Sequence, residues 1–84
     1  MTLTDPTPGT VNATTLDARG LKCPMPIVRT AQAIKNVASG ELLEVLTTDP
    51  GAVADFAAWS RSTGNELVEQ TIADGVYRFV LRRK

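Results

Sequence analysis

The spacing of apolar residues predicts two helices. The first runs from Pro24 to Ser39 and Gly40, where the glycine can adopt the left-handed conformation that closes a helix. Polar residues occupy the other side of this segment, as in a helix that packs one face on a core. Its apolar positions are Ile27, Ala31, Ile34 and Val37 or Ala38.

The second helix is predicted to begin at Asp49 and Pro50. Aspartate is a favoured N-cap residue, and proline is favoured at the first helical position because its missing N–H group would have no partner within the helix. Gly64 is expected to end this helix. The inward-facing positions of the helix are Val53, Phe56, Ala57 and Ser60.

Alternating apolar and polar residues predict four β-strands, over residues 13–17, 41–47, 67–73 and 76–82. In the second strand, Leu43 and Val45 share one face. The last two strands are joined at Asp74-Gly75, a dipeptide typical of tight hairpins.

The predicted elements follow the order β-α-β-α-β-β. Right-handed crossovers place both helices on the same side of the sheet when the strand order does not reverse. We therefore predict an α/β (α+β) two-layer sandwich, with a four-stranded mixed sheet and two helices on one face. This domain takes residues 13–84, and residues 1–12, which have little to bury, are expected to form a flexible tail.

Charge and composition exclude several classes of protein. Nine basic and nine acidic residues cancel among 84, so direct binding to nucleic acid is not expected. No apolar run is long enough to cross a membrane, and the first residues lack the pattern of a secretory signal. A single cysteine also fits a reducing compartment. We expect a cytoplasmic protein that acts as a monomer.

Histidine is absent from the sequence, and this absence narrows the chemistry. Nucleophiles activated by histidine and metal sites built on histidine are both excluded. No metal site is predicted. The remaining candidate nucleophile is Cys23, the one cysteine of the chain.

Cys23 stands directly before two prolines in the stretch ARGLKCPMPIVRT. If Cys23 is the N-cap of the first helix, Pro24 and Pro26 occupy its first and third positions. Neither proline then removes a hydrogen bond, because the first amides of a helix have no partner within it. Gly20 and the motif Cys23-Pro24-Met25-Pro26 are therefore predicted to hold the sulfur at a helix N-terminus.

The charges near Cys23 in the sequence favour a reactive thiol. Arg19, Lys22 and Arg29 lie within six positions of it, and the amide of Met25 is expected to be free to face the sulfur. A helix N-terminus and nearby cations lower the pKa of a thiol. We predict an exposed Cys23 with a moderately lowered pKa. The alternative is a small buried core residue, since free cysteines are among the most buried residues.

Asp49 is expected to lie near Cys23, because the loops that follow two parallel neighbouring strands emerge at the same edge of a sheet. As a site residue, Asp49 would orient a partner. The favoured alternative is that it serves only as the N-cap of the second helix.

Three further features have a structural and a functional interpretation. Trp59 is expected to pack at the edge of the core, and Arg61 to lie on a solvated helix face; contact with a partner is the alternative for both. Arg78 and the terminal residues 82–84 are expected to serve solubility and to protect the edge of the last strand. A basic contact surface for tRNA or an acidic partner is the alternative.

Several motifs of this chain occur together in one known family. They are Leu16-Asp17, Gly20, Cys23-Pro24-Met25-Pro26, Gly40-Glu41, Asp49-Pro50, the stretch 64–67 and the closing Tyr-x-Phe-x-Leu-Arg pattern. From about Leu16 to Lys84, the chain resembles the TusA family of small sulfur carriers, also called SirA-like proteins. The resemblance implies the same two-layer fold.

The resemblance also implies a function for Cys23. It would accept a sulfane sulfur as a persulfide, or carry a thiosulfonate, and pass the sulfur to another protein. Implied donors are a cysteine desulfurase or a rhodanese; implied uses are tRNA 2-thiouridine synthesis, sulfur supply to the molybdenum cofactor and sulfur oxidation. The protein would be a sulfurtransferase that acts only with partner proteins, with no cofactor beyond the sulfur on Cys23.

Two other functions remain as alternatives. A thiol-based redox sensor would use oxidation of Cys23 to a sulfenic acid, although no second cysteine is present to resolve it. A non-catalytic regulatory or RNA-binding module would use the face of the sheet, although the net charge of zero gives RNA no general attraction.

Overall fold

The computed structural model describes residues 14–84, so the predicted tail over residues 1–12 lies outside the described residues. The described chain follows the predicted order of elements. In sequence these are β1 (Thr14–Ala18), α1 (Met25–Ala33), a short 3₁₀ helix η1 (Ile34–Asn36), β2 (Leu42–Thr47), α2 (Ala52–Thr63), β3 (Glu66–Ala73) and β4 (Val76–Arg82).

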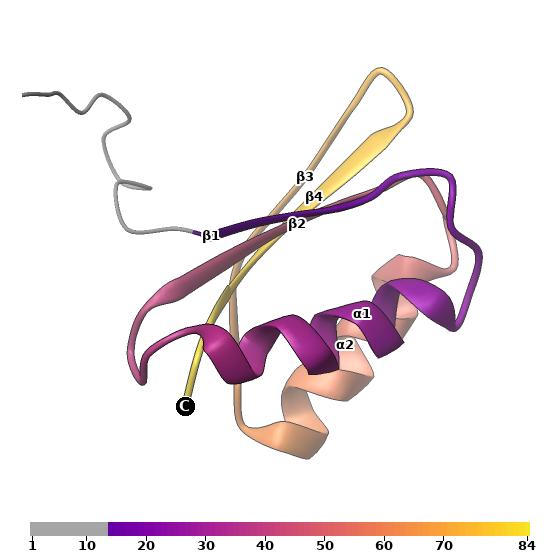
Figure 1. Cartoon of the computed structure of the whole chain (residues 1–84). Coiled ribbons are helices and arrows are strands. Elements are labelled where there is room, and N and C mark those ends of the chain that lie inside the picture. The colour runs from indigo at the N-terminus through magenta and orange to yellow at the C-terminus, as the bar shows by residue number, and fades with distance from the viewer. Residues whose placement is uncertain (1–13) are drawn as a thin grey trace, which may run out of the picture.

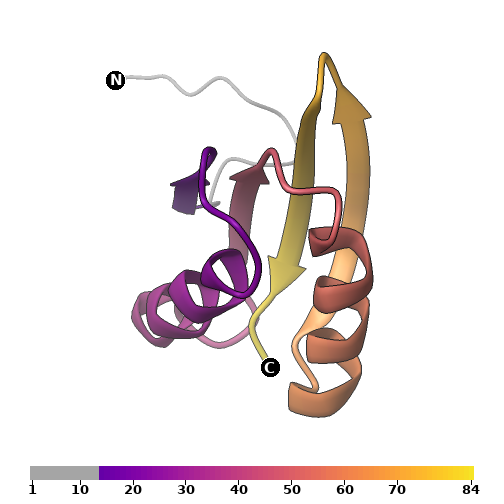
Figure 2. The same ribbon diagram turned by 90° about the vertical axis from the view of Figure 1, so that its right-hand side faces the viewer.

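The four strands form one mixed sheet in the order β1-β2-β4-β3. β1 pairs with β2 in parallel, and β4 runs antiparallel to both β2 and β3. The two long helices cover the same face of the sheet, which Figures 1 and 2 show from two sides. The predicted two-layer sandwich is thereby confirmed. The structure also gives the order of the strands in the sheet, which the sequence pattern did not predict.

The core lies between the sheet and the helices. Leu43 and Val45 of β2 are fully buried on this side, as their shared face predicts. Phe56 of α2 stacks on Phe79 of β4, with ring centroids 4.4 Å apart and an angle of 16° between the rings. Stacking of two fully buried rings ties α2 to the centre of the sheet, and α2 begins close to Cys23.

The first helix differs from its prediction in length and in its buried side. It ends at Ala33 and continues as η1, and its fully buried positions include Pro26 and Thr30, whereas Ile27 is only half-buried. The hydroxyl of Thr30 donates to the carbonyl of Pro26 at 2.8 Å. Because its hydroxyl is satisfied within the helix, Thr30 can be buried, and a search for apolar residues alone misses it.

The face of the sheet away from the helices carries an ion-pair network. Arg78 pairs with Glu44 and, at 3.0 Å, with Glu69, while Arg82 pairs with Glu66 at 3.2 Å. These arginines are therefore matched by carboxylates. The alternative of a basic contact surface therefore loses two of its cations, Arg78 and Arg82, to these ion pairs.

The C-terminal residues have a structural role instead. β4 is a central strand, so the prediction that these residues protect a sheet edge is wrong. Arg83 donates to the carbonyl of Val37 at 2.6 Å and to that of Lys35 at 3.3 Å. These contacts fasten the end of the chain to the segment between α1 and β2.

Two predicted glycine positions are confirmed. Asp74 and Gly75 both have positive φ angles, 53° and 77°, as a type I′ hairpin turn requires. Gly64 ends α2 in the left-handed conformation, with a φ of 81°. Within residues 14–84, no helix has the length and apolar character needed to span a membrane.

Candidate functional site

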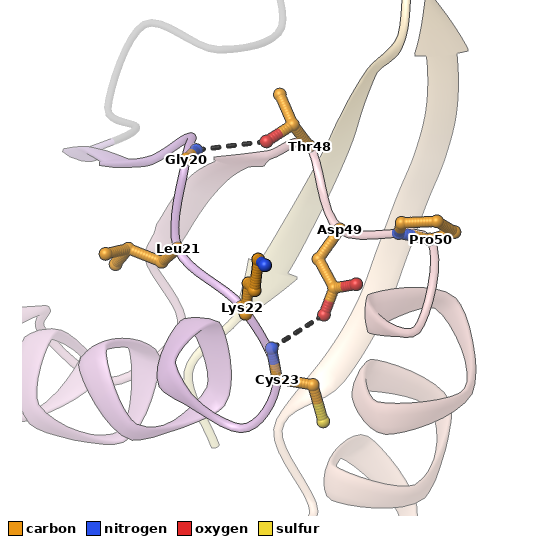
Figure 3. Close-up of a pocket in the computed structure, with 7 residues that line it drawn as sticks. All are labelled: Gly20, Leu21, Lys22, Cys23, Thr48, Asp49 and Pro50. Atoms are coloured by element: carbon orange, nitrogen blue, oxygen red, sulfur yellow. Dashed lines mark hydrogen bonds between the residues drawn. The ribbon is translucent and has the colours of Figure 1, made fainter.

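The site forms where the loops after β1 and β2 meet. Because these strands are parallel neighbours, both loops leave the same edge of the sheet. They enclose an open hollow of about 450 Å³. Its lining, drawn in Figure 3, consists of Gly20, Leu21, Lys22, Cys23, Thr48, Asp49 and Pro50.

Two hydrogen bonds hold the loops together across this hollow (Figure 3). The amide of Gly20 donates to the Thr48 hydroxyl at 3.0 Å, and the amide of Cys23 donates to Asp49 Oδ2 at 2.8 Å. The other carboxylate oxygen of Asp49 accepts from the amide of Gly51 at 3.2 Å. Asp49 thus fixes the backbone of Cys23 relative to the start of α2, and its predicted closeness to Cys23 is confirmed.

The predicted helix starts are each displaced. The cap of α1 is Pro24, and Pro26 stands at the second helical position, so Cys23 precedes the cap and is not itself the N-cap. The Cys23–Pro24 peptide bond is cis. The amide of Met25 donates to the carbonyl of Lys22 at 2.8 Å, which contradicts the prediction that it is free to face the sulfur.

The second helix likewise begins later than predicted. Gly51 is its cap, so Asp49 and Pro50 both precede the helix. The side chain of Asp49 does not cap α2 in the predicted way, because one of its oxygens is bound to Cys23 and the other closes a short turn to Gly51. Its contact with Cys23 favours the role of a site residue.

The sulfur of Cys23 is exposed, which excludes the alternative of a buried core cysteine. It points toward the side on which α2 lies (Figure 3). The thiol donates a hydrogen bond to Asp55 Oδ2 in the first turn of α2, with the two heavy atoms 2.7 Å apart. The sulfur is thus reachable from solvent but bound to a carboxylate.

The pKa of Cys23 is raised, so the prediction of a lowered pKa is wrong. The main cause is the hydrogen bond to Asp55, followed by desolvation and then by the negative charges of Asp55 and Asp49. A carboxylate that accepts a hydrogen bond from the thiol stabilises the neutral form, and a second carboxylate opposes formation of an anion.

The predicted cations do not offset this effect. Arg19 is engaged by Asp17 through two hydrogen bonds of 2.9 Å, and this pairing lowers the pKa of Asp17 to about 2. Lys22 lines the hollow and Arg29 is exposed on α1, but within residues 14–84 neither forms an ion pair. Sequence proximity to Cys23 was therefore a poor guide to the charge around its sulfur.

Asp55 is the site residue that the sequence pattern did not single out. It lies 32 positions from Cys23 but contacts its sulfur. One signal could have found it: the helix after β2 begins beside the loop after β1, and Asp55 lies in the first turn of that helix. The parallel pairing of β1 and β2, which places Asp49 near Cys23, places this turn there as well.

Two other predicted positions fall away from the hollow. Trp59 is partly buried against the core, as the structural interpretation predicts. Arg61 is exposed in the last turn of α2, and within residues 14–84 it forms no ion pair. Neither residue lines the hollow beside Cys23.

Comparison of the sequence with known proteins identifies the family of this chain. The profile described as "Sulfurtransferase TusA" matches residues 14–83. The sulfur carrier protein TusA of Allochromatium vinosum is 44% identical over 68 residues, which are 81% of this chain and 90% of the relative. The sulfur carrier protein TusA of Pseudomonas putida is 38% identical over 82 residues, 98% of each chain.

A solved structure supports the fold. The crystal structure of a SirA-like protein from Desulfitobacterium hafniense superposes with a TM-score of 0.72. It is 24% identical in sequence, and the match covers 81% of this chain and 93% of that one. At this identity, the likeness bears on the architecture alone.

Proposed function

The chain belongs to the TusA family of sulfur carriers, and from this premise we propose that Cys23 accepts a sulfane sulfur as a persulfide and delivers it to a partner protein. The observation that carries the proposal is the exposed sulfur beside an open hollow, on a backbone that Asp49 holds in place. A donor and an acceptor can reach such a sulfur in turn.

Sulfur transfer to Cys23 needs only a thiolate. The Cys23 thiolate attacks the outer sulfur of a donor persulfide, a new S–S bond forms on Cys23, and the S–S bond of the donor breaks. The electron pair of the broken bond leaves on the donor sulfur as a thiolate. Delivery repeats the exchange, with a thiolate of the acceptor attacking the outer sulfur on Cys23.

The absence of a second cysteine in the sequence suits a carrier. No internal thiol is available to attack the persulfide, so the sulfur stays on Cys23 until a thiol of another protein removes it. We propose a cysteine desulfurase or a rhodanese as the donor and a downstream sulfur acceptor as the second partner. Persulfide sulfur would then be the only group carried, with no further cofactor.

The remaining motif residues would support this exchange. Gly20 has a φ of 83°, which favours glycine, and turns the chain toward the hollow. Pro24 and Pro26 would fix the start of α1 behind the sulfur. Met25, 38% exposed beside Cys23, would contact a partner, and Lys22 and Arg29 would contribute to docking.

The two alternative functions receive less support. An oxidation sensor often resolves its sulfenic acid with a second cysteine, whereas Cys23 is the one cysteine of the sequence. An RNA-binding sheet face needs available cations, whereas Arg78 and Arg82 are paired with carboxylates.

The test is transfer of sulfur from a defined donor. The protein is incubated with a cysteine desulfurase and cysteine, or with a rhodanese and thiosulfate, and its intact mass is measured. We expect a gain of one sulfur atom that dithiothreitol reverses and that Cys23→Ser lacks. A folded protein that gains no sulfur from either donor class would contradict the proposal.

A further inference from the structure

The environment of Cys23 conflicts with the chemistry of a carrier. Sulfur transfer requires a thiolate, yet the carboxylates of Asp55 and Asp49 lie next to Cys23 and oppose formation of that anion. Resting on the sulfur-carrier function proposed above, we propose that Asp55 and Asp49, the acidic pair, keep Cys23 protonated in the free protein. A partner protein then activates it by presenting a cationic side chain to this pair.

The acidic pair is held by the fold. Asp55 Oδ2 accepts a hydrogen bond from the Cys23 thiol at 2.7 Å, and Asp49 Oδ2 accepts one from the Cys23 amide at 2.8 Å. The two carboxylates come from the first turn of α2 and the loop before it. Because Asp49 also binds the amide of Gly51 at 3.2 Å, the pair and the sulfur form one connected unit.

Among the described residues, 14–84, no cation is paired with the negative charge of this unit. The ion pairs formed among residues 14–84 include neither Asp49 nor Asp55. The loop between β1 and α1, which holds Cys23, carries Lys22 and Arg19, and Arg19 is paired with Asp17. Arg29 is the charged residue of α1. The other charged residue of α2, Arg61, stands in its last turn, away from the hollow.

A docked cation would shift Cys23 from the neutral thiol toward the thiolate. An arginine or lysine beside Asp55 would occupy the carboxylate oxygen that now accepts the hydrogen bond from the thiol. It would also offset both negative charges, so the cost of forming a thiolate would fall. The thiol proton would pass to solvent, and the thiolate would attack the partner's persulfide as described above.

Activation by the partner would couple reactivity to docking. Thiols react with oxidants and stray disulfides mainly as thiolates. An exposed Cys23 that stays protonated between encounters would react slowly with both. The proposed partner surface therefore carries a cation next to its own reactive sulfur, facing the hollow between the two loops.

Titration of the thiolate tests the role of the acidic pair directly. Thiolate absorbance in the ultraviolet is followed against pH for the unmodified protein, Asp55→Asn and Asp49→Asn. We expect the midpoint to fall in Asp55→Asn and to fall less in Asp49→Asn, because Asp55 alone touches the sulfur. At neutral pH, alkylation of Asp55→Asn by iodoacetamide should be faster by about threefold or more.

Glu41→Gln is the matched control. It removes one exposed carboxylate that precedes β2, at the opposite end of that strand from Asp49. Net charge changes as in the test variants, so a long-range effect of charge would appear in all three. We expect the thiol titration of Glu41→Gln to match that of the unmodified protein.

Charged disulfides test the proposed cation. Cystamine carries two ammonium groups and dithiodiglycolate two carboxylates, and each transfers half of itself to Cys23 with release of the other half as a thiolate. We expect Cys23 to react faster with cystamine than with dithiodiglycolate. This preference should be stronger for Cys23 than for glutathione, which serves as the reference thiol. This preference should weaken in Asp55→Asn and Asp49→Asn and persist in Glu41→Gln.

The outcomes separate this inference from the carrier function. Equal titrations of Asp55→Asn and the unmodified protein, or slower alkylation of the variant, would overturn the role of the acidic pair, even if sulfur loading succeeds. If the midpoint falls in Asp55→Asn as expected but the unmodified protein gains no sulfur from a donor, the carrier function is overturned instead. If Asp55→Asn does not fold, lack of a preference for cystamine in the unmodified protein overturns the inference.

Discussion

Two groups of charged residues in this small domain are organised in opposite ways. On the open face of the sheet, Glu44, Glu69 and Glu66 are each paired with an arginine. At the edge beside Cys23, Asp49 and Asp55 have no such partner among residues 14–84. A net charge of zero conceals this difference. Charges that are matched hold the fold, whereas the unmatched pair controls the protonation of a thiol.

The largest expected effect is on stability, from the paired face. Arg78→Met leaves Glu44 and Glu69 without their cation, and Glu44 is only partly exposed. We expect the free energy of unfolding to fall by about 1–2 kcal/mol, between the values typical of exposed and buried pairs. Urea denaturation measures the change, and Arg61→Met, which removes an arginine that has no ion pair within residues 14–84, should cost less. Equal losses in the two variants would contradict the distinction.

Acid should weaken the same ion-pair network and so lower the stability of the fold. The hydrogen bond from Arg78 is the main cause that lowers the pKa of Glu44. A lowered folded-state pKa gives stability that is present above the unfolded value of about 4.3 and is lost as the pH falls through the folded value. Over this range, urea denaturation should show a smaller loss for Arg78→Met than for the unmodified protein. Parallel curves would show that the pair does not set the pKa of Glu44.

Alkaline pH should lower the stability of the protein through the ionisation of Cys23. The raised pKa of Cys23, caused mainly by Asp55, gives stability that is complete below the unfolded value of about 8.5 and is lost as the pH rises through the folded value. The unmodified protein should therefore lose more stability than Cys23→Ser above about pH 8.5. Thermal unfolding in matched buffers measures the difference, and identical curves would argue against the hydrogen bond to Asp55.

The smallest effect is expected from Lys22. Although adjacent to Cys23 in the sequence, Lys22 is not among the causes that shift the pKa of the thiol. Lys22→Gln should change the rate of alkylation by iodoacetamide at neutral pH by less than about twofold, as for an exposed charge screened by solvent. A change as large as that of Asp55→Asn would show that the cation dominates the site.

The sequence predicted the architecture because its signals are local. Alternation in β2, the Asp74-Gly75 turn and the glycine that ends α2 each depend on neighbouring residues, and each is confirmed. The starts of both helices were displaced because Cys23 and Asp49 bind each other and leave the capping positions to Pro24 and Gly51. Competition between side chains that are distant in sequence cannot be read from local patterns.

The electrostatics of the site were predicted with the wrong sign for the same reason. Arg19 was expected to act on Cys23, but its nearest carboxylate, Asp17, binds it first. Asp55 contributes the largest effect from a position far along the chain. The proposal that Cys23 carries the sulfur needed only its motif, whereas its protonation state depends on which side chains the fold brings to the sulfur.

The most direct test of this account is the ionisation of Cys23 in the free protein, followed by NMR through the chemical shift of its Cβ atom. We expect a neutral thiol at neutral pH and a midpoint that moves to lower pH in Asp55→Asn. A thiolate already present at neutral pH, or a midpoint that Asp55→Asn leaves in place, would contradict it.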